Sequence, residues 1–250
     1  MKLTTSTALL IDQNKDALII FYQGKTALLP RGNVALKKIC DQLSASFAFN
    51  GEAGQTAVLP TGKSIAADRL ILAGVGDAKH FHNGLLEQAA AAATRAGLAT
   101  GARSFAIASG IALKRITEAE YHLLAGRGAV WGTYSFSSFK SGSKKPAAAS
   151  LTFAGPIKSR HAISHATAQG KALLSTADLA NLPGNEAPPS KIATWARTMA
   201  KANGLTCQVL GKAELTKKGC GAILSVAQGS AQDAKMIILT HAGVNSNAQP

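Results

Sequence analysis

The chain has 250 residues, 46% of them hydrophobic and 16% charged, so it can bury one sizeable core or two small ones and is not a disordered tail. Its 27 Lys and Arg oppose 13 Asp and Glu. The resulting charge of +14 excludes an acidic, calcium-buffering protein and leaves nucleic acid or an acidic partner open. The three cysteines form no C-x-x-C pair, which argues against a disulfide framework and a cysteine-built zinc site. The first apolar run is too short for a signal peptide and no stretch reaches about 18 apolar residues, so we expect a cytoplasmic protein without a membrane partner.

Residues 1–155 alternate short apolar runs with longer segments of helical period, which predicts an α/β domain with mostly parallel strands. The runs that fit strands are β-branched or leucine-rich, at 17–22, 69–73, 104–108 and 150–154. Helices are expected at 34–47, at 118–136 and after Asn83, which can cap an alanine-rich segment.

A basic loop and a linker helix are expected next, over residues 156–188. The segment 161–182 has a helical period, and one stripe of it is made of mostly small residues, Ala166, Gly170, Leu173 and Ala177. Such a stripe favours close packing against a neighbouring element.

A second α/β domain is predicted over residues 189–250. Ser190 can cap a helix whose apolar face consists of Ile192, Trp195, Ala196, Met199 and Ala200. A strand at 206–210, a helix that Gly219 ends and a strand at 236–239 follow. Because two strands with two helices leave a parallel sheet with an open edge, we expect this domain to be incomplete.

Two glycine-containing motifs suggest phosphate sites, but each lacks a part. The TGKS segment at 61–64 resembles the end of a P-loop, yet Ala57 stands where that pattern needs a glycine. Gly74 and Gly76 follow a predicted strand in the place of a dinucleotide turn, but Lys79 replaces the third glycine. A tight turn between strand and helix is therefore the favoured interpretation.

Metal and nucleophile motifs are equally partial. His161 and His165 lie one helical turn apart and can present two imidazoles to a transition metal, but no third ligand lies nearby in the sequence. The histidines at 80 and 82 have the same deficiency. No G-x-S-x-G segment offers a serine nucleophile.

The charge pattern is uneven, because no acidic residue occurs between Glu120 and Asp178. Such a stretch is either a solvated basic surface or a contact for an anion. The candidate nucleic-acid contacts are Lys140, Lys144, Lys145, Lys158 and Arg160.

Residues 170–239 carry a specific string of motifs: a turn with Leu179, Asn181, Pro183 and Asn185, then the Gly219-x-Gly221 pair, the AQGS segment at 227–230 and an apolar strand. In this order the string resembles the junction and early catalytic domain of the leucyl (cytosol) aminopeptidase family. The segments RLILAGVG at 69–76 and TYSFSSFK at 133–140 resemble the amino-terminal domain of the same family, nearest to its bacterial aminopeptidase A branch.

The resemblance implies a macro-domain-like amino-terminal domain, a linker helix and the start of a di-metal exopeptidase domain, in a homo-hexameric enzyme that uses two divalent ions, manganese or zinc. The family's V-G-K-G-x-T-F-D and N-T-D-A-E-G-R-L segments do not occur here. No catalytic and no metal-binding residue is therefore assigned in this chain. The acids after residue 160 are too few and scattered for a two-metal site: Asp178, Glu186, Glu214 and Asp233.

Three hypotheses follow. The chain is the amino-terminal region of a leucyl-aminopeptidase-like metalloexopeptidase, cut short and inactive alone. Alternatively, it is a DNA-binding or regulatory module derived from that family, which the charge of +14 suits. A third hypothesis, based on fold analogy, is that an ADP-ribose-like ligand binds near Gly74 and Gly76.

Overall fold

The computed structural model describes residues 1–250 except 31, 63, 112, 114–115, 142–148 and 244–250. It contains two compact units, Met1–Ala177 and Asp178–Pro250. Within the described residues, no helix combines the length and apolarity that crossing a membrane requires.

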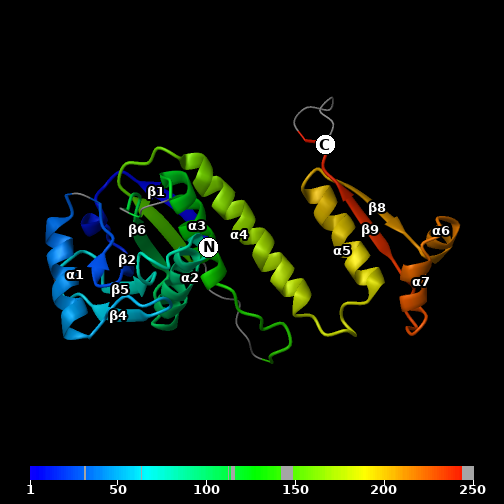
Figure 1. Cartoon of the computed structure of the whole chain (residues 1–250), viewed down its shortest axis with the longest axis horizontal. Coiled ribbons are helices and arrows are strands. Elements are labelled where there is room, and N and C mark those ends of the chain that lie inside the picture. Colours follow the sequence, from blue (N-terminus) through cyan, green and yellow to red (C-terminus); the bar gives the residue numbers. More distant parts are fainter. Residues whose placement is uncertain (31, 63, 112, 114–115, 142–148, 244–250) are drawn as a thin grey trace. The chain divides into compact units, whose positions relative to one another are not determined.

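The first unit is built on one twisted sheet, shown in Figure 1, and belongs to the α/β class as predicted. The strand order is β1-β7-β6-β2-β5-β4. Five strands run parallel: β1 (Lys2–Ser6), β2 (Ala17–Gln23), β5 (Arg69–Gly74), β6 (Ser104–Ala108) and β7 (Ser150–Ala154). Two strands pair antiparallel: β4 (Thr56–Pro60) with β5, and β3 (Thr26–Ala27) with β2. The four predicted strands are confirmed, whereas β1, β3 and β4 were not anticipated.

Helices cover both faces of this sheet, which explains why β2 is apolar on both faces from Ala17 to Phe21. Its odd-numbered residues, such as Phe21, join a core cluster with α2 (Asn83–Ala99) and α3 (Glu118–Gly132). Its even-numbered residues, such as Leu18, join a second cluster with α1 (Val34–Ser46). A short 3-10 helix, η1, spans Leu10–Asp12.

The linker helix α4 (Arg160–Ala180) packs on α3 through small residues. A Cβ added to Gly170 would lie 2.7 Å from Val130, and Ala166 faces Gly126. The predicted packing stripe is thus confirmed at these two positions. It fails further along, because Leu173 is 40% exposed.

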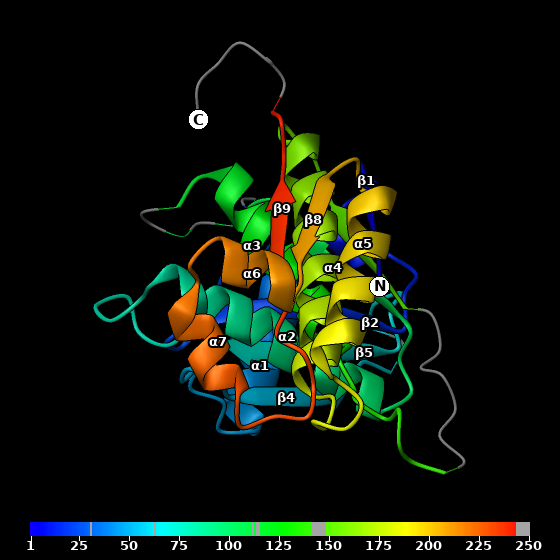
Figure 2. The same cartoon turned by 90° about the vertical axis from the view of Figure 1, so that its right-hand side faces the viewer.

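The second unit has a helix, a strand, two short helices and a strand: α5 (Pro189–Ala202), β8 (Thr206–Leu210), α6 (Lys212–Lys217), α7 (Gly221–Ala227) and β9 (Met236–Thr240). Figure 2 shows β8 and β9 side by side; they pair antiparallel, so the expected parallel sheet is wrong. The last residue of β8, Leu210, pairs with the first residue of β9, Met236. A parallel pair would need a connection that crosses back over one face of the sheet. The two intervening helices pack at that end instead of crossing a face of the sheet.

Several helix boundaries also differ from the predictions. Ser190 is not an N-cap, because Pro188 takes that position and Pro189 begins α5. A proline is well suited there, since its fixed φ fits the first helical residue and its missing N–H would have no partner. Asn83 is the first residue of α2 rather than its cap. The helix α3 ends at Gly132, four residues early, and α7 was not predicted.

Candidate functional site

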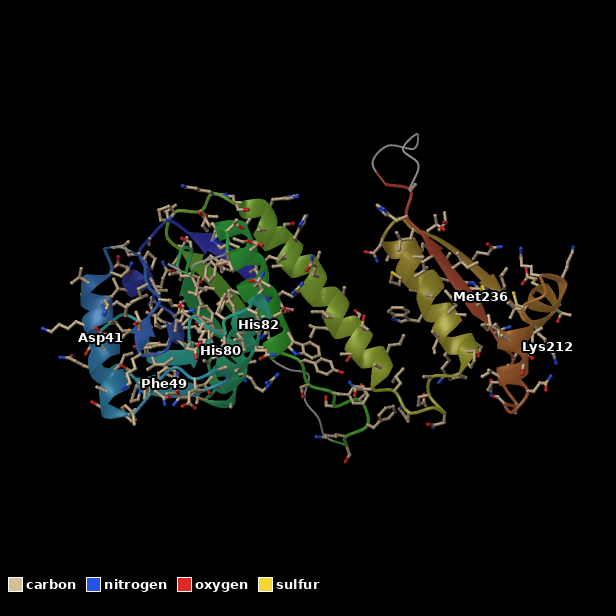
Figure 3. The ribbon with its side chains drawn as sticks, viewed as in Figure 1. Asp41, Phe49, His80, His82, Lys212 and Met236 are labelled. Atoms are coloured by element: carbon tan, nitrogen blue, oxygen red, sulfur yellow. The ribbon has the colours of Figure 1, made fainter. Side chains whose placement is uncertain are left out.

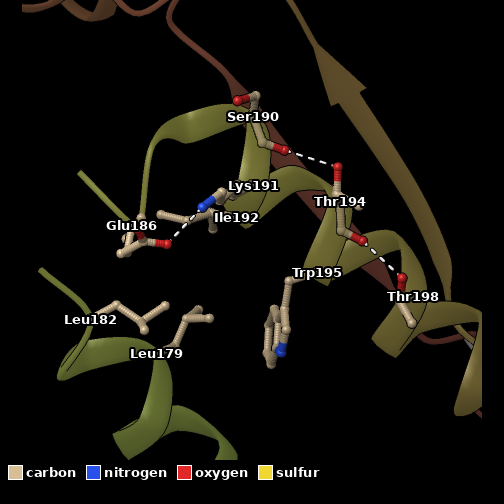
Figure 4. Close-up of a pocket in the computed structure, with 10 residues that line it drawn as sticks. Leu179, Leu182, Glu186, Ser190, Lys191, Ile192, Thr194, Trp195 and Thr198 are labelled. Atoms are coloured by element: carbon tan, nitrogen blue, oxygen red, sulfur yellow. Dashed lines mark hydrogen bonds and ion pairs between the residues drawn. The ribbon is translucent and has the colours of Figure 1, made fainter. Parts of the chain in front are cut away.

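An open apolar groove of about 500 Å³ lies in the second unit, between the end of α4 and α5 (Figure 4). Its lining residues come from the last turn of α4, the connecting turn and one face of α5: Leu179, Leu182, Glu186, Ala187, Ser190, Lys191, Ile192, Thr194, Trp195 and Thr198. One lining residue, Leu179, belongs to the turn motif that carried the family resemblance.

Local backbone chemistry explains the turn. The Pro183 carbonyl accepts hydrogen bonds from the amides of Glu186 (2.8 Å) and Ala187 (3.1 Å), which closes the chain after α4. Pro188 and Pro189 then start α5. The apolar residues predicted to be buried on α5 are only partly so: Ile192 and Trp195 are half-buried and face the groove, as Figure 4 shows for both.

Four polar side chains of the groove, those of Glu186, Lys191, Thr194 and Thr198, are engaged with other groups of the same segment. Glu186 and Lys191 form an ion pair of 2.8 Å, drawn in Figure 4. The hydroxyl of Thr194 donates to the Ser190 carbonyl, and that of Thr198 donates to the Thr194 carbonyl, both at 3.0 Å. What remains open to a ligand is apolar surface, so the groove suits an apolar side chain and offers no nucleophile paired with a base.

The carboxylates of the second unit do not fit a two-metal ligand set. Glu214 accepts a hydrogen bond from the Gly211 amide at 2.8 Å and caps α6, while Glu186 pairs with Lys191. Nowhere in the part of the chain that the structure describes do three His, Cys, Asp or Glu side chains gather as a metal site would require.

The histidine pair on α4 is exposed, and its two rings lie 4.1 Å apart between centroids. His161 and His165 therefore share one helix face, as their spacing predicts. Figure 3 labels the other pair, His80 and His82, at the entrance of α2, where His80 lies 3.0 Å from Asp77. The two imidazoles on α4 fall short of the three protein ligands typical of a zinc site, and His80, His82 and Asp77 do not gather as a group of three ligands.

The Gly74–Gly76 turn has no free amide for a phosphate. Each of its three N–H groups donates to a main-chain carbonyl: Gly74 to Gln55 at 2.9 Å, Val75 to Tyr22 at 2.8 Å and Gly76 to Gly51 at 3.0 Å. A Cβ on Gly74 would lie 2.0 Å from the Glu52 carbonyl, so protein backbone already occupies the space. This is the tight turn that the sequence favoured, and it removes the support for an ADP-ribose-like ligand at this turn.

The TGKS segment likewise lacks the setting of a P-loop. It connects the antiparallel strands β4 and β5, and no helix follows it before β5. The Thr61 hydroxyl donates to the Ala67 carbonyl inside this connection. A phosphate loop needs a following helix whose first amides point at the anion, so Thr61, Gly62 and Ser64 belong to a strand-to-strand connection, while Lys63 lies outside the described residues.

The candidate nucleic-acid contacts separate into two places. The helices α3 and α4 run in the same direction, since Gly126 faces Ala166 and Val130 faces Gly170. The Lys158 amide donates to Glu118 at 2.8 Å, so Lys158 and Arg160 lie at the amino ends of these helices. The segment after Gly132 that contains Lys140 follows the carboxyl end of α3, and Figure 1 shows this green segment leaving α3 at the end away from the start of α4. Lys144 and Lys145 lie outside the described residues.

A second cavity, of about 650 Å³, lies in the first unit beside α1; Figure 3 labels Asp41 and Phe49 of its lining. Lys37 and Asp41 pair across one turn of α1 at 2.6 Å, and Lys25 is a further cation of the lining. Cys40 is buried on the inner side of α1, and this burial raises the pKa of its thiol to about 12. The sequence did not point to this cavity, because its residues come from a turn, a helix and a loop whose approach depends on the fold.

Polar groups that are half-buried, as Asp16 is, or buried, as His122 is, fasten the sheet instead of forming a reactive cluster. Asp16 accepts hydrogen bonds from the Arg103 and Ser104 amides at 2.6 and 2.9 Å, and these bonds lower the pKa of its carboxyl. His122 is buried, and its Nε2 donates to the Ser109 carbonyl at 2.6 Å. Burial is the main cause that lowers the pKa of His122, so its ring is neutral at pH 7.

Both units of the chain are similar to known proteins. The amino-terminal domain of the cytosol aminopeptidase family matches residues 21–143, and its catalytic domain matches residues 175–250. The "Probable cytosol aminopeptidase" of Azotobacter vinelandii (strain DJ / ATCC BAA-1303) is 32% identical over 253 residues, which cover 98% of this chain and 47% of that protein. The corresponding protein of Hydrogenovibrio crunogenus (strain DSM 25203 / XCL-2) is 31% identical and covers 100% of this chain and 51% of its own length.

Two solved structures share the fold. A mutant of tomato leucine aminopeptidase superposes with a TM-score of 0.76 at 21% identity, over 96% of this chain and 50% of that one. The bottromycin maturation enzyme BotP has a TM-score of 0.71 at 24% identity, over 91% of this chain and 46% of its own.

The protein thus has an α/β fold with two units. The first unit contains the match to the amino-terminal domain of a peptidase family, and the second unit lies within the match to its catalytic domain. The chain belongs to the cytosol aminopeptidase family, as the motif string indicated. It spans about half the length of the curated relatives it matches.

Proposed function

We propose that this chain is the amino-terminal region of an exopeptidase that removes amino-terminal residues from peptides. The observation that supports it most directly is the match of residues 175–250 to the catalytic domain of the family, which follows in the chain the match of residues 21–143 to the amino-terminal domain. The complete enzyme would use two divalent ions, manganese or zinc, act in the cytoplasm and assemble as a homo-hexamer. We assign 1–155 to the amino-terminal domain, 156–188 to the basic loop and linker helix, and 189–250 to the start of the catalytic domain.

We infer that the 250-residue chain alone does not hydrolyse peptides. A two-metal site needs several carboxylates that converge on ions about 4 Å apart. In the second unit, Glu186 and Glu214 are engaged by Lys191 and by the Gly211 amide. The ligands would then have to come from polypeptide that corresponds to the unmatched half of the relatives.

A chimera tests this function. Residues 1–250 are followed by the part of the Azotobacter vinelandii relative that lies beyond its matched segment. With Mn²⁺ or Zn²⁺, the chimera should hydrolyse leucyl-p-nitroanilide and lose activity with a chelator, whereas the 250-residue chain and the relative's part alone should be inactive. Chelator-sensitive turnover by the 250-residue chain would overturn the inferred inactivity. A folded, metal-loaded chimera without turnover would overturn the exopeptidase function.

A second candidate function, contact with DNA, rests on the acid-free stretch between Glu120 and Asp178 and on the charge of +14. Lys158 and Arg160, at one end of α4, are the paired contacts that the fold favours. Replacing both by glutamine should reduce the salt dependence of duplex binding by about one unit of slope per lost phosphate contact. The same change at Lys140 is the matched comparison. Absence of any binding at low salt would exclude this function.

A further inference from the structure

The first turns of α4 carry two exposed histidines on a helix that is fixed on its other side. Ala162 and Ala166 are buried, and the Cβ of Ala166 would lie 2.9 Å from a Cβ added to Gly126 of α3. His161 and His165 are exposed. Packing therefore holds the backbone that carries the two imidazoles, while both rings are open to a ligand from solvent.

The two rings lie close to the separation that a shared metal ion requires. With metal–nitrogen bonds of about 2.0 Å and a right angle at the metal, the bonded nitrogens lie about 2.9 Å apart and the ring centroids about 4.5 Å apart. The centroids of His161 and His165 are 4.1 Å apart, and the ring planes are tilted by 53° instead of stacked. Small rotations of the two side chains therefore suffice to direct one nitrogen of each ring at a common ion.

The rings are not engaged by other polar groups. In the described part of the chain, neither ring takes part in a hydrogen bond or an ion pair. Glu118, which lies at the same end of α4, accepts a hydrogen bond from the Lys158 amide at 2.8 Å. No third His, Cys, Asp or Glu of the described residues gathers with the pair, so water would fill the other positions of a bound ion.

The donor set selects the ion. Imidazole nitrogen suits Cu²⁺, Ni²⁺ and Zn²⁺, whereas Mg²⁺, Ca²⁺ and Mn²⁺ prefer oxygen ligands, and no acidic residue occurs between Glu120 and Asp178. Cu²⁺ binds such nitrogens most tightly of the first-row divalent ions and accepts a tetragonal geometry that water can complete. The positive charges of Arg160 and Lys171 on the same helix oppose any cation, which further favours the ion with the strongest bonds to nitrogen.

We propose that His161 and His165 form a site for one Cu²⁺ ion per chain, bound by one nitrogen of each ring and by water. The site is separate from the two ions proposed for the complete exopeptidase, and its test requires no peptide hydrolysis. Because the two ligands lie one helical turn apart, bound copper would also fix the first turns of α4.

The test is a titration of the untagged 250-residue chain with Cu²⁺ at pH 8. Cys207 and Cys220 are replaced by serine in every sample, so that half-buried thiols neither bind nor reduce the ion. Calorimetry should give one ion per chain, and electron paramagnetic resonance should show coupling to two imidazole nitrogens. Zn²⁺ should bind at least tenfold more weakly than Cu²⁺.

Variants of α4 test the geometry. His165→Ala should weaken Cu²⁺ binding at least tenfold. Adding Ala168→His to this variant restores the number of histidines at an exposed position, but the pair is then seven residues apart, about 10.5 Å along the helix, and should bind as weakly as His165→Ala alone. The control, His80→Gln with His82→Gln, removes the histidines before α2 and should leave the affinity unchanged.

The proposal is overturned if the parent and His165→Ala bind Cu²⁺ equally, or if the relocated pair binds as the parent does with unchanged circular dichroism. It is also overturned if the spectrum shows a single imidazole nitrogen, or if size-exclusion chromatography shows that one ion joins two chains. Copper binding as expected, together with a chimera that shows no turnover, would support this site while contradicting the exopeptidase function, so the two failures are distinguishable.

Discussion

The packing of α3 on α2 depends on Gly128, and Gly128→Ala tests this dependence. A Cβ at this position would lie 2.3 Å from the Glu87 carbonyl oxygen, far inside van der Waals contact, and the obstructing atom is backbone. Two effects oppose each other. Alanine is intrinsically better in a helix interior than glycine by about 1 kcal/mol. Overpacking that a side-chain rotation cannot relieve costs about 1–3 kcal/mol, and more when backbone must shift.

The second effect should be the larger, because the pair Arg127–Glu87 fastens the two helices at the same place with two contacts of 2.6 Å. Because the obstructing atom is backbone, we take the upper end of the overpacking cost, about 3 kcal/mol, and subtract the gain of about 1 kcal/mol from alanine, which gives an expected net loss of about 2 kcal/mol of unfolding free energy for the first unit. Urea unfolding followed by Trp131 fluorescence in a Trp195→Phe background measures this unit alone. The matched control is Gly84→Ala in α2, where the added Cβ meets only the exposed His82 ring at 3.1 Å. A Gly128→Ala variant as stable as the parent would refute the close-packing argument.

Three further predictions concern the same unit. Glu87→Gln should cost about 1–3 kcal/mol in urea unfolding, because it removes a charge-assisted pair whose two side chains are mostly buried; equal midpoints for variant and parent would contradict this. Asp16 has a lowered pKa in the folded state, so it contributes stability at pH values above its unfolded pKa, and this contribution is lost as the pH falls through the folded pKa. Asp16→Asn should accordingly show less loss of unfolding free energy between pH 7 and pH 3 than the parent, and an identical acid dependence would exclude the role. The buried Cys40 thiol, with a pKa of about 12, should resist a thiol reagent at pH 8 while the half-buried Cys207 reacts, as peptide mapping after brief labelling can show; equal labelling would contradict the burial argument.

The candidate site shows where inference from the sequence reaches its limit. The turn motif with Leu179 and Pro183 was visible, and it identified the family. That the same turn borders an apolar groove with half-buried Trp195 depends on the approach of α5 to the end of α4. A helical period places Ile192 and Trp195 on one face, but it does not state how completely that face is covered.

The amino-acid sequence by itself determined the α/β class, the four central strands, most helices and the family, because these depend on local signals: unbroken apolar runs, helical periodicity and an ordered string of motifs. Only the tertiary structure decided the pairing. The strand Lys2–Ser6 is held by β7 from the other end of the unit, and Met236 pairs with Leu210 so that β8 and β9 run antiparallel. The tertiary structure also separated Lys140 from Lys158, which the sequence had grouped by charge. Strand partners, groove walls and charge patches bring together residues distant in the chain, and their free energy comes from contacts that no local pattern encodes.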